Sequence, residues 1–220
     1  MSFIVLGIAA SVFTMPVIWI SYSENVIGHI SVNKRRLCKE NLTAWAKLLI
    51  LGVVGGIVLA WMRYTVYDHE PIHVLIELFA YIWLIPVAQI DGRTRRIPNR
   101  WILYGFIGSV LFLIIEKIVG NTSWIEMGSG LIGALFGGGF FLLASLISNG
   151  GIGMGDAKMY MILGLLIGKD RIFALILITL VFALVHGFLL LLTKKGNHKT
   201  QVPLGPFAYV AMVVMLLLIK

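Results

Sequence analysis

Two aspartates in otherwise apolar surroundings are the residues of this sequence best suited to chemistry. Asp91 lies in QIDGRTRRIPN and Asp156 in GGIGMGDAK, each at one end of a long apolar run. A carboxylate near a lipid bilayer is costly and is seldom kept without a function. Two carboxyl groups placed close together cannot both ionise cheaply, so one stays protonated beside an anion. Such a pair can hydrolyse an amide, because the anion takes a proton from water and the acid protonates the carbonyl oxygen or leaving nitrogen.

The expected positions of the two aspartates on helices favour different roles for them. Asp91 should end a helix, where the negative pole of the helix dipole favours the protonated acid. Asp156 should begin a helix, where the positive pole favours the anion. We therefore expect Asp156 to act first as the base and Asp91 as the acid. The preference is about 0.3–1 kcal/mol, so substrate binding could reverse it.

The composition indicates an integral membrane protein. The 220-residue chain is 59% hydrophobic and 13% charged, and a water-soluble domain could not cover that much apolar surface. The net charge of +8 first indicates cytoplasmic loops beside anionic lipid. Basic stripes interleaved with aromatics are not seen, so we expect no nucleic-acid partner. The single cysteine, Cys38, cannot form an internal disulfide or a Cys-rich zinc site. We expect no metal or cofactor, because a pair of carboxyl groups can activate water without one.

Long apolar runs predict an all-α, polytopic protein with about eight transmembrane helices, since a span needs about 20 apolar residues and must satisfy its own backbone. The expected helices are residues 3–21, 44–62, 72–90, 101–119, 127–148, 157–168, 171–193 and 204–219. We expect a single membrane domain over 1–220, in which 1–71 supplies two N-terminal helices of unclear role and 72–219 forms the core. The first helix lacks a basic leader segment and a cleavage site, and is expected to be retained.

The sixth run is too short for an ordinary span. About twelve residues separate Asp156 from Lys169, or roughly 18 Å, against a hydrocarbon layer about 30 Å thick. Asp156 could lie below the cytoplasmic surface, with the glycine-rich loop dipping inward. Alternatively, helices six and seven could form a re-entrant pair. We expect the first arrangement.

The distribution of basic residues predicts the orientation of the helices. Thirteen of the 18 Lys and Arg side chains lie on the side of the odd-numbered loops, which the positive-inside rule places in the cytoplasm. The other five are Arg63, Lys117, Lys169, Arg171 and Lys220. Both termini are then expected outside, with Asp91 and Asp156 both facing the cytoplasm.

Three motifs occur in a fixed order along the chain. They are Asp91-x5-Ile97-Pro98-Asn99, Gly151-x-Gly153-x-Gly155-Asp156-x-Lys158 and Pro203-x-Gly205-Pro206-Phe207. Pro98 ends one helical segment and starts the next, and the glycines let backbone approach a ligand closely or simply make a flexible loop. The proline-rich element opens the last helix, on the same face.

Together these motifs resemble the type IV prepilin peptidase family, which are polytopic aspartic proteases of the Gly-x-Gly-Asp class. The resemblance covers roughly residues 72–219 and implies that Asp91 and Asp156 are the catalytic pair. It also implies substrate or loop-forming roles for Pro98, Asn99, Gly151, Gly153, Gly155 and Lys158. The expected substrates are prepilins or pseudopilins, whose short basic leaders are cut at the cytoplasmic face.

One departure from the family concerns methylation. Full-length members carry a cytoplasmic insert with paired Cys-x-x-Cys motifs after the first helix, and they also methylate the new N-terminus. Here that region has about twenty polar residues and only Cys38. We therefore expect a peptidase without N-methyltransferase activity, like the archaeal preflagellin or compact Flp-type prepilin peptidases.

Other functions remain open at this point. A presenilin-like or signal-peptide-peptidase-like protease would place its first aspartate in mid-helix after a tyrosine, whereas Asp91 follows Ile90. A proton-coupled carrier would place its carboxylates at the bilayer midplane between related halves, which are not apparent. An inactive pilus-assembly factor is the third alternative, and loss or retention of prepilin processing in aspartate variants distinguishes it.

Four further features receive structural interpretations. Glu77 is expected to pair with His73, one turn before it, near the outer face. His186 is expected to pack as a neutral residue, and Lys158 to meet lipid head groups rather than Asp156. The run of glycines at 137–139 should let two helices approach closely in lipid.

Overall fold

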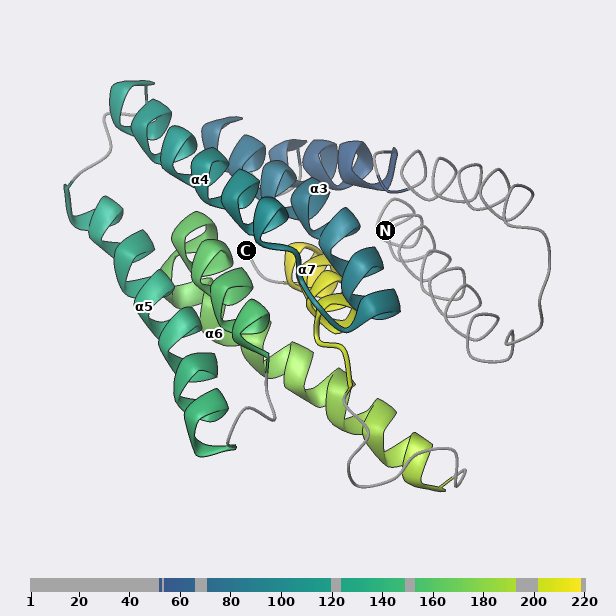
Figure 1. The fold of residues 1–220 in the computed structure, drawn as a ribbon. Helices are drawn as coiled ribbons and strands as arrows, with labels where there is room; N and C mark the ends of the chain where they lie inside the picture. The colour runs from purple at the N-terminus through teal and green to yellow at the C-terminus, as the bar shows by residue number, and fades with distance from the viewer. Residues whose placement is uncertain are drawn as a thin grey trace, which may run out of the picture.

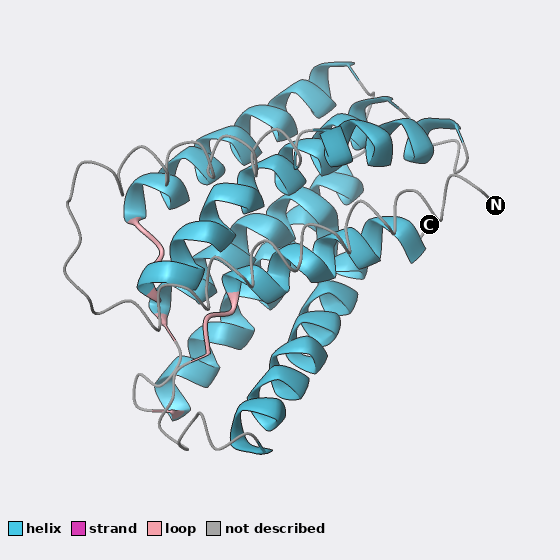
Figure 2. Ribbon diagram, turned by 90° about the vertical axis from the view of Figure 1, so that its right-hand side faces the viewer, coloured by secondary structure: helices cyan, strands magenta, loops and turns pink. Residues whose placement is uncertain are grey.

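The computed structural model describes residues 52, 54–65, 71–119, 124–148, 153–192 and 202–218, and these residues fold as a bundle of helices (Figure 1). After helical residues 54–65, the bundle comprises α3 (Pro71–Thr94), α4 (Asn99–Val119), α5 (Trp124–Ile147), α6 (Met154–Leu192) and α7 (Gly205–Leu218). Within the described ranges all regular structure is helical, joined by short loops (Figure 2). The expected helix 3–21, most of 44–53 and Cys38 lie outside these ranges.

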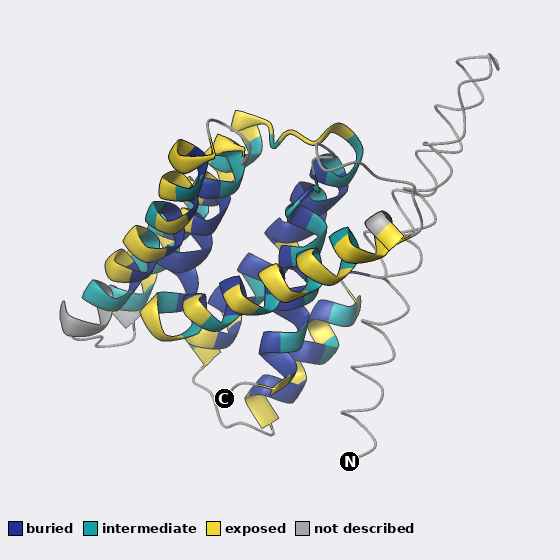
Figure 3. Ribbon diagram, turned by 90° about the horizontal axis from the view of Figure 1, so that it is seen from below, coloured by how far each residue is buried: buried dark blue, intermediate teal, exposed yellow. Residues whose placement is uncertain are grey.

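Four of these helices, α3 to α6, are long and apolar enough to cross a membrane, and α7 is a shorter apolar helix. Buried side chains face the interior of the bundle, whereas the outer faces of α4 and α5 and the second half of α6 carry exposed apolar side chains (Figure 3). Apolar side chains exposed over whole helix faces are stable against lipid and not against water. The chain is thus an all-α, multi-pass membrane protein.

The turn between α3 and α4 is built as the sequence predicts. Arg95 takes a positive φ of 53° and its N–H donates to the carbonyl of Asp91 at 2.8 Å, which ends α3. Ile97 is non-helical before Pro98, and α4 begins at the next residue, as a proline requires. The indole Nε1 of Trp83 donates to the carbonyl of Trp101 at 2.9 Å and ties the two helices together.

The runs expected as separate helices, 157–168 and 171–193, are the two parts of α6, which the non-helical Gly168 separates. Gly168 has φ 76° and ψ 174°, a backbone conformation that glycine adopts without a Cβ clash. On one side of the break α6 runs antiparallel to α5, because Gly133 approaches Gly164 and Gly137 approaches Tyr160. On the other side it runs parallel to α5, because Gly133 approaches Gly168 and Gly137 approaches Ile172. The two parts of α6 therefore form a helical hairpin that turns at Gly168 (Figure 1).

Glycines let α5 and α6 pack backbone against backbone. A Cβ on Gly133 or Gly164 would collide with the backbone of the other, and a Cβ on Gly137 would meet the carbonyl of Tyr160. A Cβ on Gly138 would lie 2.9 Å from that of Met161, whereas one on Gly139 would have nothing within 4 Å. The expected close approach at residues 137–139 is confirmed for the first two glycines, as is typical of small residues at helix interfaces in lipid.

Candidate active site

Asp91 lies in the last turn of α3 and is buried, with 4% of its surface exposed. Its Oδ2 accepts a hydrogen bond of 2.8 Å from the N–H of Gly205, the first residue of α7. Only a residue without a side chain fits there, because a Cβ on Gly205 would lie 2.9 Å from the Cβ of Asp91 and 3.3 Å from the Cα of Ala88. The proline-rich motif thus brings the N-terminus of α7 onto the carboxyl group of Asp91.

Asp156 lies in the first turn of α6 and is half-buried. Its N–H donates to the carbonyl of Gly153 at 3.0 Å, which folds the end of the glycine-rich loop onto the helix. Gly155 lies against Ile97, whose Cβ would be 3.2 Å from a Cβ at that position. The start of α6 therefore meets the turn that follows Asp91.

The element ends that carry the two aspartates meet in the folded chain. The aspartates are 65 positions apart in the sequence. The turn that follows Asp91 packs on the start of α6, where Gly155 lies against Ile97, and the start of α7 reaches Asp91 itself. Asp91 is also close enough to Asp156 for its charge to act on that carboxyl group.

The hydrogen bond from Gly205 bears on which aspartate acts first as the base. A backbone N–H that donates to a carboxyl oxygen favours the anion, and this bond is made to Asp91. It acts against the assignment of Asp91 as the acid, which considered only helix poles. Asp156 at its helix N-terminus is also favoured as an anion, so these contacts do not separate the roles of the two residues.

The remaining motif residues surround this pair. Lys158 is exposed and donates from Nζ to Oδ1 of Asn99 at 3.2 Å. This hydrogen bond joins the start of α6 to the start of α4, so two of the motif residues contact each other. Pro98 forms the turn, and Gly153 lies beside the carboxyl of Asp156. Gly151 lies outside the described residues.

The N–H of Gly205 is the contact at this site that the sequence analysis missed. Its motif predicted a rigid helix start on the correct face, but not the group that it meets. The available signal was the general one that helix N-termini carry unpaired N–H donors suited to anions.

A second charged cluster lies at the opposite end of the bundle, and it corrects the expected pairing of Glu77 with His73. Arg63 donates to both carboxylate oxygens of Glu77, from Nε at 2.9 Å and from Nη2 at 2.8 Å. Arg171 also contacts Glu77, and His73 lies instead 3.7 Å from Glu116. Glu77 has these partners because α3 packs against residues far away in the sequence, which one-turn spacing does not reveal.

A cavity of about 510 Å³ opens beside this cluster, at the break in α6. It is lined by residues that include His73, Glu116, Lys169 and Arg171. Within the described ranges, no three His, Cys, Asp or Glu side chains gather as a metal site requires.

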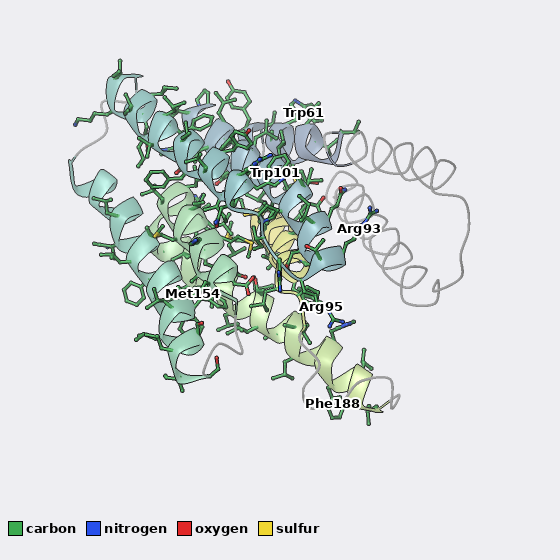
Figure 4. The ribbon with its side chains drawn as sticks, viewed as in Figure 1. Trp61, Arg93, Arg95, Trp101, Met154 and Phe188 are labelled. Carbon is green, nitrogen blue, oxygen red and sulfur yellow. The ribbon has the colours of Figure 1, made fainter. Side chains whose placement is uncertain are left out.

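At the other end of the bundle, Arg95 follows α3 and points away from the helices, while Met154 begins α6 (Figure 4). His186 packs against Phe207, with ring centroids 5.2 Å apart.

Comparison with known proteins identifies relatives of this chain. A family model described as the type IV leader peptidase family matches residues 78–190. The prepilin leader peptidase/N-methyltransferase of Bacillus subtilis (strain 168) is 27% identical over 124 residues, which are 56% of this chain and 47% of that protein. The chain thus matches about half of the length of this curated relative, and no solved structure matches it. Since the family match extends over half of the chain and includes both aspartates, the chain belongs to the type IV leader peptidase family.

Proposed function

We propose that this protein is a membrane aspartic endopeptidase that removes leader peptides from prepilins or prepilin-like proteins, with Asp91 and Asp156 as its catalytic pair. The observation that supports the proposal best is that the turn after Asp91 packs on the helix start that carries Asp156, with Gly155 against Ile97. Both belong to the part of the chain that matches the leader peptidase family, and a curated relative is named as a prepilin leader peptidase.

In the proposed reaction one carboxylate takes a proton from water, which attacks the carbonyl carbon of the leader junction. The protonated carboxyl supplies a proton to the departing nitrogen, and the C–N bond breaks to give two peptides. Since Asp91 is held by Gly205 and Asp156 by its helix start, the pair is fixed before substrate arrives. Such preorganisation lowers the cost of reaching the transition state.

We also propose that the pair faces the cytoplasm and lies below the membrane surface. Gly138 of α5 lies beside Ala157, the residue after Asp156, so Asp156 is at the same depth as Gly138. From Gly138, α5 continues for about nine more residues, or about 14 Å. That end of α5 carries exposed Leu143, Leu146 and Ile147, which are suited to lipid. The orientation follows from the count of basic residues, of which 13 lie on the proposed cytoplasmic side and five on the other.

The decisive experiment is processing of a co-expressed prepilin by wild type, Asp91→Asn and Asp156→Asn, analysed by gel mobility. Asparagine keeps the shape of each side chain and removes its acid–base function, so both variants should leave the precursor uncut. Asp170→Asn is the matched control, because Asp170 is exposed at the break in α6 and should leave processing intact. Equal processing by all four proteins would exclude the proposed catalytic pair.

We propose further that cleavage proceeds without methylation of the new N-terminus. The basis is the resemblance noted above, in which the methylating members carry a Cys-rich insert that this sequence lacks between its first two expected helices. Mass spectrometry of the processed prepilin should show an unmethylated N-terminal residue, and a methylated product would contradict this.

A further inference from the structure

Tyr160 is a buried tyrosine beside the proposed catalytic pair that no motif includes. It is 0% exposed, and its hydroxyl is one of two buried side-chain polar groups, within the described part of the chain, that make no hydrogen bond. A buried hydroxyl without a partner costs about 1–3 kcal/mol, and such groups are rare enough to require an explanation.

The position of Tyr160 on α6 relates it to Asp156. The two residues are one helical turn apart, and residues at this spacing lie on the same helix face. Helical side chains lean toward the N-terminus, so the tyrosine ring extends back toward the turn that carries Asp156. The hydroxyl and the carboxyl interact electrostatically, although they make no direct hydrogen bond.

The tyrosine ring is held in place by neighbours on other helices. It stacks on Phe141 of α5, with centroids 4.2 Å apart and planes at 18°. Thr179, in the second part of α6, lies near the hydroxyl. Its Oγ1 donates to the carbonyl of Leu175 at 2.7 Å and keeps lone pairs that could accept from Tyr160, but the two hydroxyls do not meet in hydrogen-bonding geometry. The ring is therefore fixed while the hydroxyl proton still needs an acceptor.

We propose that Tyr160 is a positioning residue whose hydroxyl donates a hydrogen bond, through one water molecule, to the carboxyl group of Asp156. The bond orients this carboxyl toward Asp91 and favours its ionised form. The charge of Asp91 acts on Asp156 from another helix and disfavours ionisation of Asp156. The hydrogen bond from Tyr160 favours ionisation of the same carboxyl group. This inference rests on the proposed function, because it assigns Tyr160 a role in the same reaction.

The test compares Tyr160→Phe with two control variants in the full-length protein. Tyr160→Phe removes only the hydroxyl and keeps the stack on Phe141. Tyr81→Phe removes a buried hydroxyl that contacts the hydroxyl of Tyr209 at 2.6 Å, about 15 Å along α3 from Asp91. Thr179→Val removes the other neighbour of the Tyr160 hydroxyl. Thermal unfolding in detergent first establishes that all three variants are folded.

We expect Tyr160→Phe to lower kcat for prepilin cleavage about tenfold to hundredfold, the usual effect of removing a group that orients a functional side chain, with KM unchanged. The acidic limb of its pH–activity profile should move to higher pH. Tyr81→Phe and Thr179→Val should keep the wild-type profile. A Tyr160→Phe profile identical to that of wild type, or an equal shift in Thr179→Val, would overturn the inference.

A spectroscopic measurement separates this inference from the proposed function. The infrared carboxyl band that disappears in Asp156→Asn reports directly on Asp156, whether or not the protein cleaves prepilin. In Tyr160→Phe that band should shift in frequency and titrate at higher pH than in Tyr81→Phe. An unshifted band would refute the hydrogen bond, whereas a shifted band in a protein that leaves prepilin uncut would refute only the proposed function.

Discussion

At the scale of single residues, the contact between Gly205 and Asp91 is the most demanding feature of the candidate site. A methyl group on Gly205 would lie 2.9 Å from the Cβ of Asp91, so Gly205→Ala must push α7 away from α3 and weaken the N–H···Oδ2 bond. A hydrogen bond to a charged group contributes about 1.5–3 kcal/mol. We therefore expect prepilin cleavage to fall about tenfold or more, measured as initial rate with purified protein.

Gly187→Ala is the matched control for this prediction. It is the same substitution in a helix, but a Cβ on Gly187 would have nothing within 4 Å. Its activity should equal that of wild type. If Gly205→Ala were equally active, close packing at Gly205 would be irrelevant to the carboxyl pair.

The individual side chains of the site could be predicted to different degrees. Asp91 and Asp156 are predicted from the cost of a carboxylate in an apolar sequence, and the helix ends that carry them pack together, with Gly155 against Ile97. The donor from Gly205 could not be predicted, because it joins segments 114 positions apart through packing of α3 on α7. The same limitation misassigned Glu77, since local spacing favoured His73 over the distant Arg63 and Arg171.

At the scale of helices, close contact of α5 and α6 sets the position of Asp156. Gly133 and Gly164 place the two backbones in direct contact, with Asp156 about two turns before Gly164. In Gly133→Ala the added Cβ would strike the backbone of α6, which cannot move as a flexible side chain can. We expect the free energy of unfolding to fall by about 1–3 kcal/mol, measured by chemical denaturation in detergent.

Gly139→Ala provides the comparison for this helix contact. It lies on the same helix, but its Cβ would meet nothing within 4 Å. Alanine is the better helix former by about 1 kcal/mol, so this variant should be as stable as wild type or more stable. Equal destabilisation of both variants would mean that backbone contact with α6 does not limit stability.

Apolar runs predicted the helices well and their exact ends less well. Residues 101–119 and 127–148 were expected as helices, and α4 and α5 agree within three residues. α3 extends past its expected end at residue 90 to Thr94, because helical hydrogen bonding continues through polar residues until Arg95 takes a positive φ. The two helices expected on either side of residues 168–171, with opposite directions across the membrane, are the two arms of the hairpin that turns at Gly168.

At the scale of the whole molecule, the buried cluster of Glu77 with Arg63 and Arg171 connects elements that are far apart in the sequence. Arg63 comes from the helix before α3 and also reaches the carbonyl of Leu216 on α7, at 3.5 Å. Glu77 belongs to α3, and Arg171 to the second part of α6. Four helices thus meet at this cluster, about 21 Å along α3 from Asp91.

We expect Arg63→Met to cost about 3–5 kcal/mol in the free energy of unfolding, the usual effect of removing one partner from a buried ion pair. The double variant Arg63→Met with Glu77→Leu should recover much of this loss, because it removes the carboxylate that the single variant leaves with fewer partners. Arg171 is 24% exposed and lines the cavity, so water can solvate it in the double variant. Steric trapping or denaturation in detergent measures both values. If the double variant were less stable than Arg63→Met, the expected recovery would be absent. The cluster would then contribute net stability to the fold, rather than only being costly to break one partner at a time.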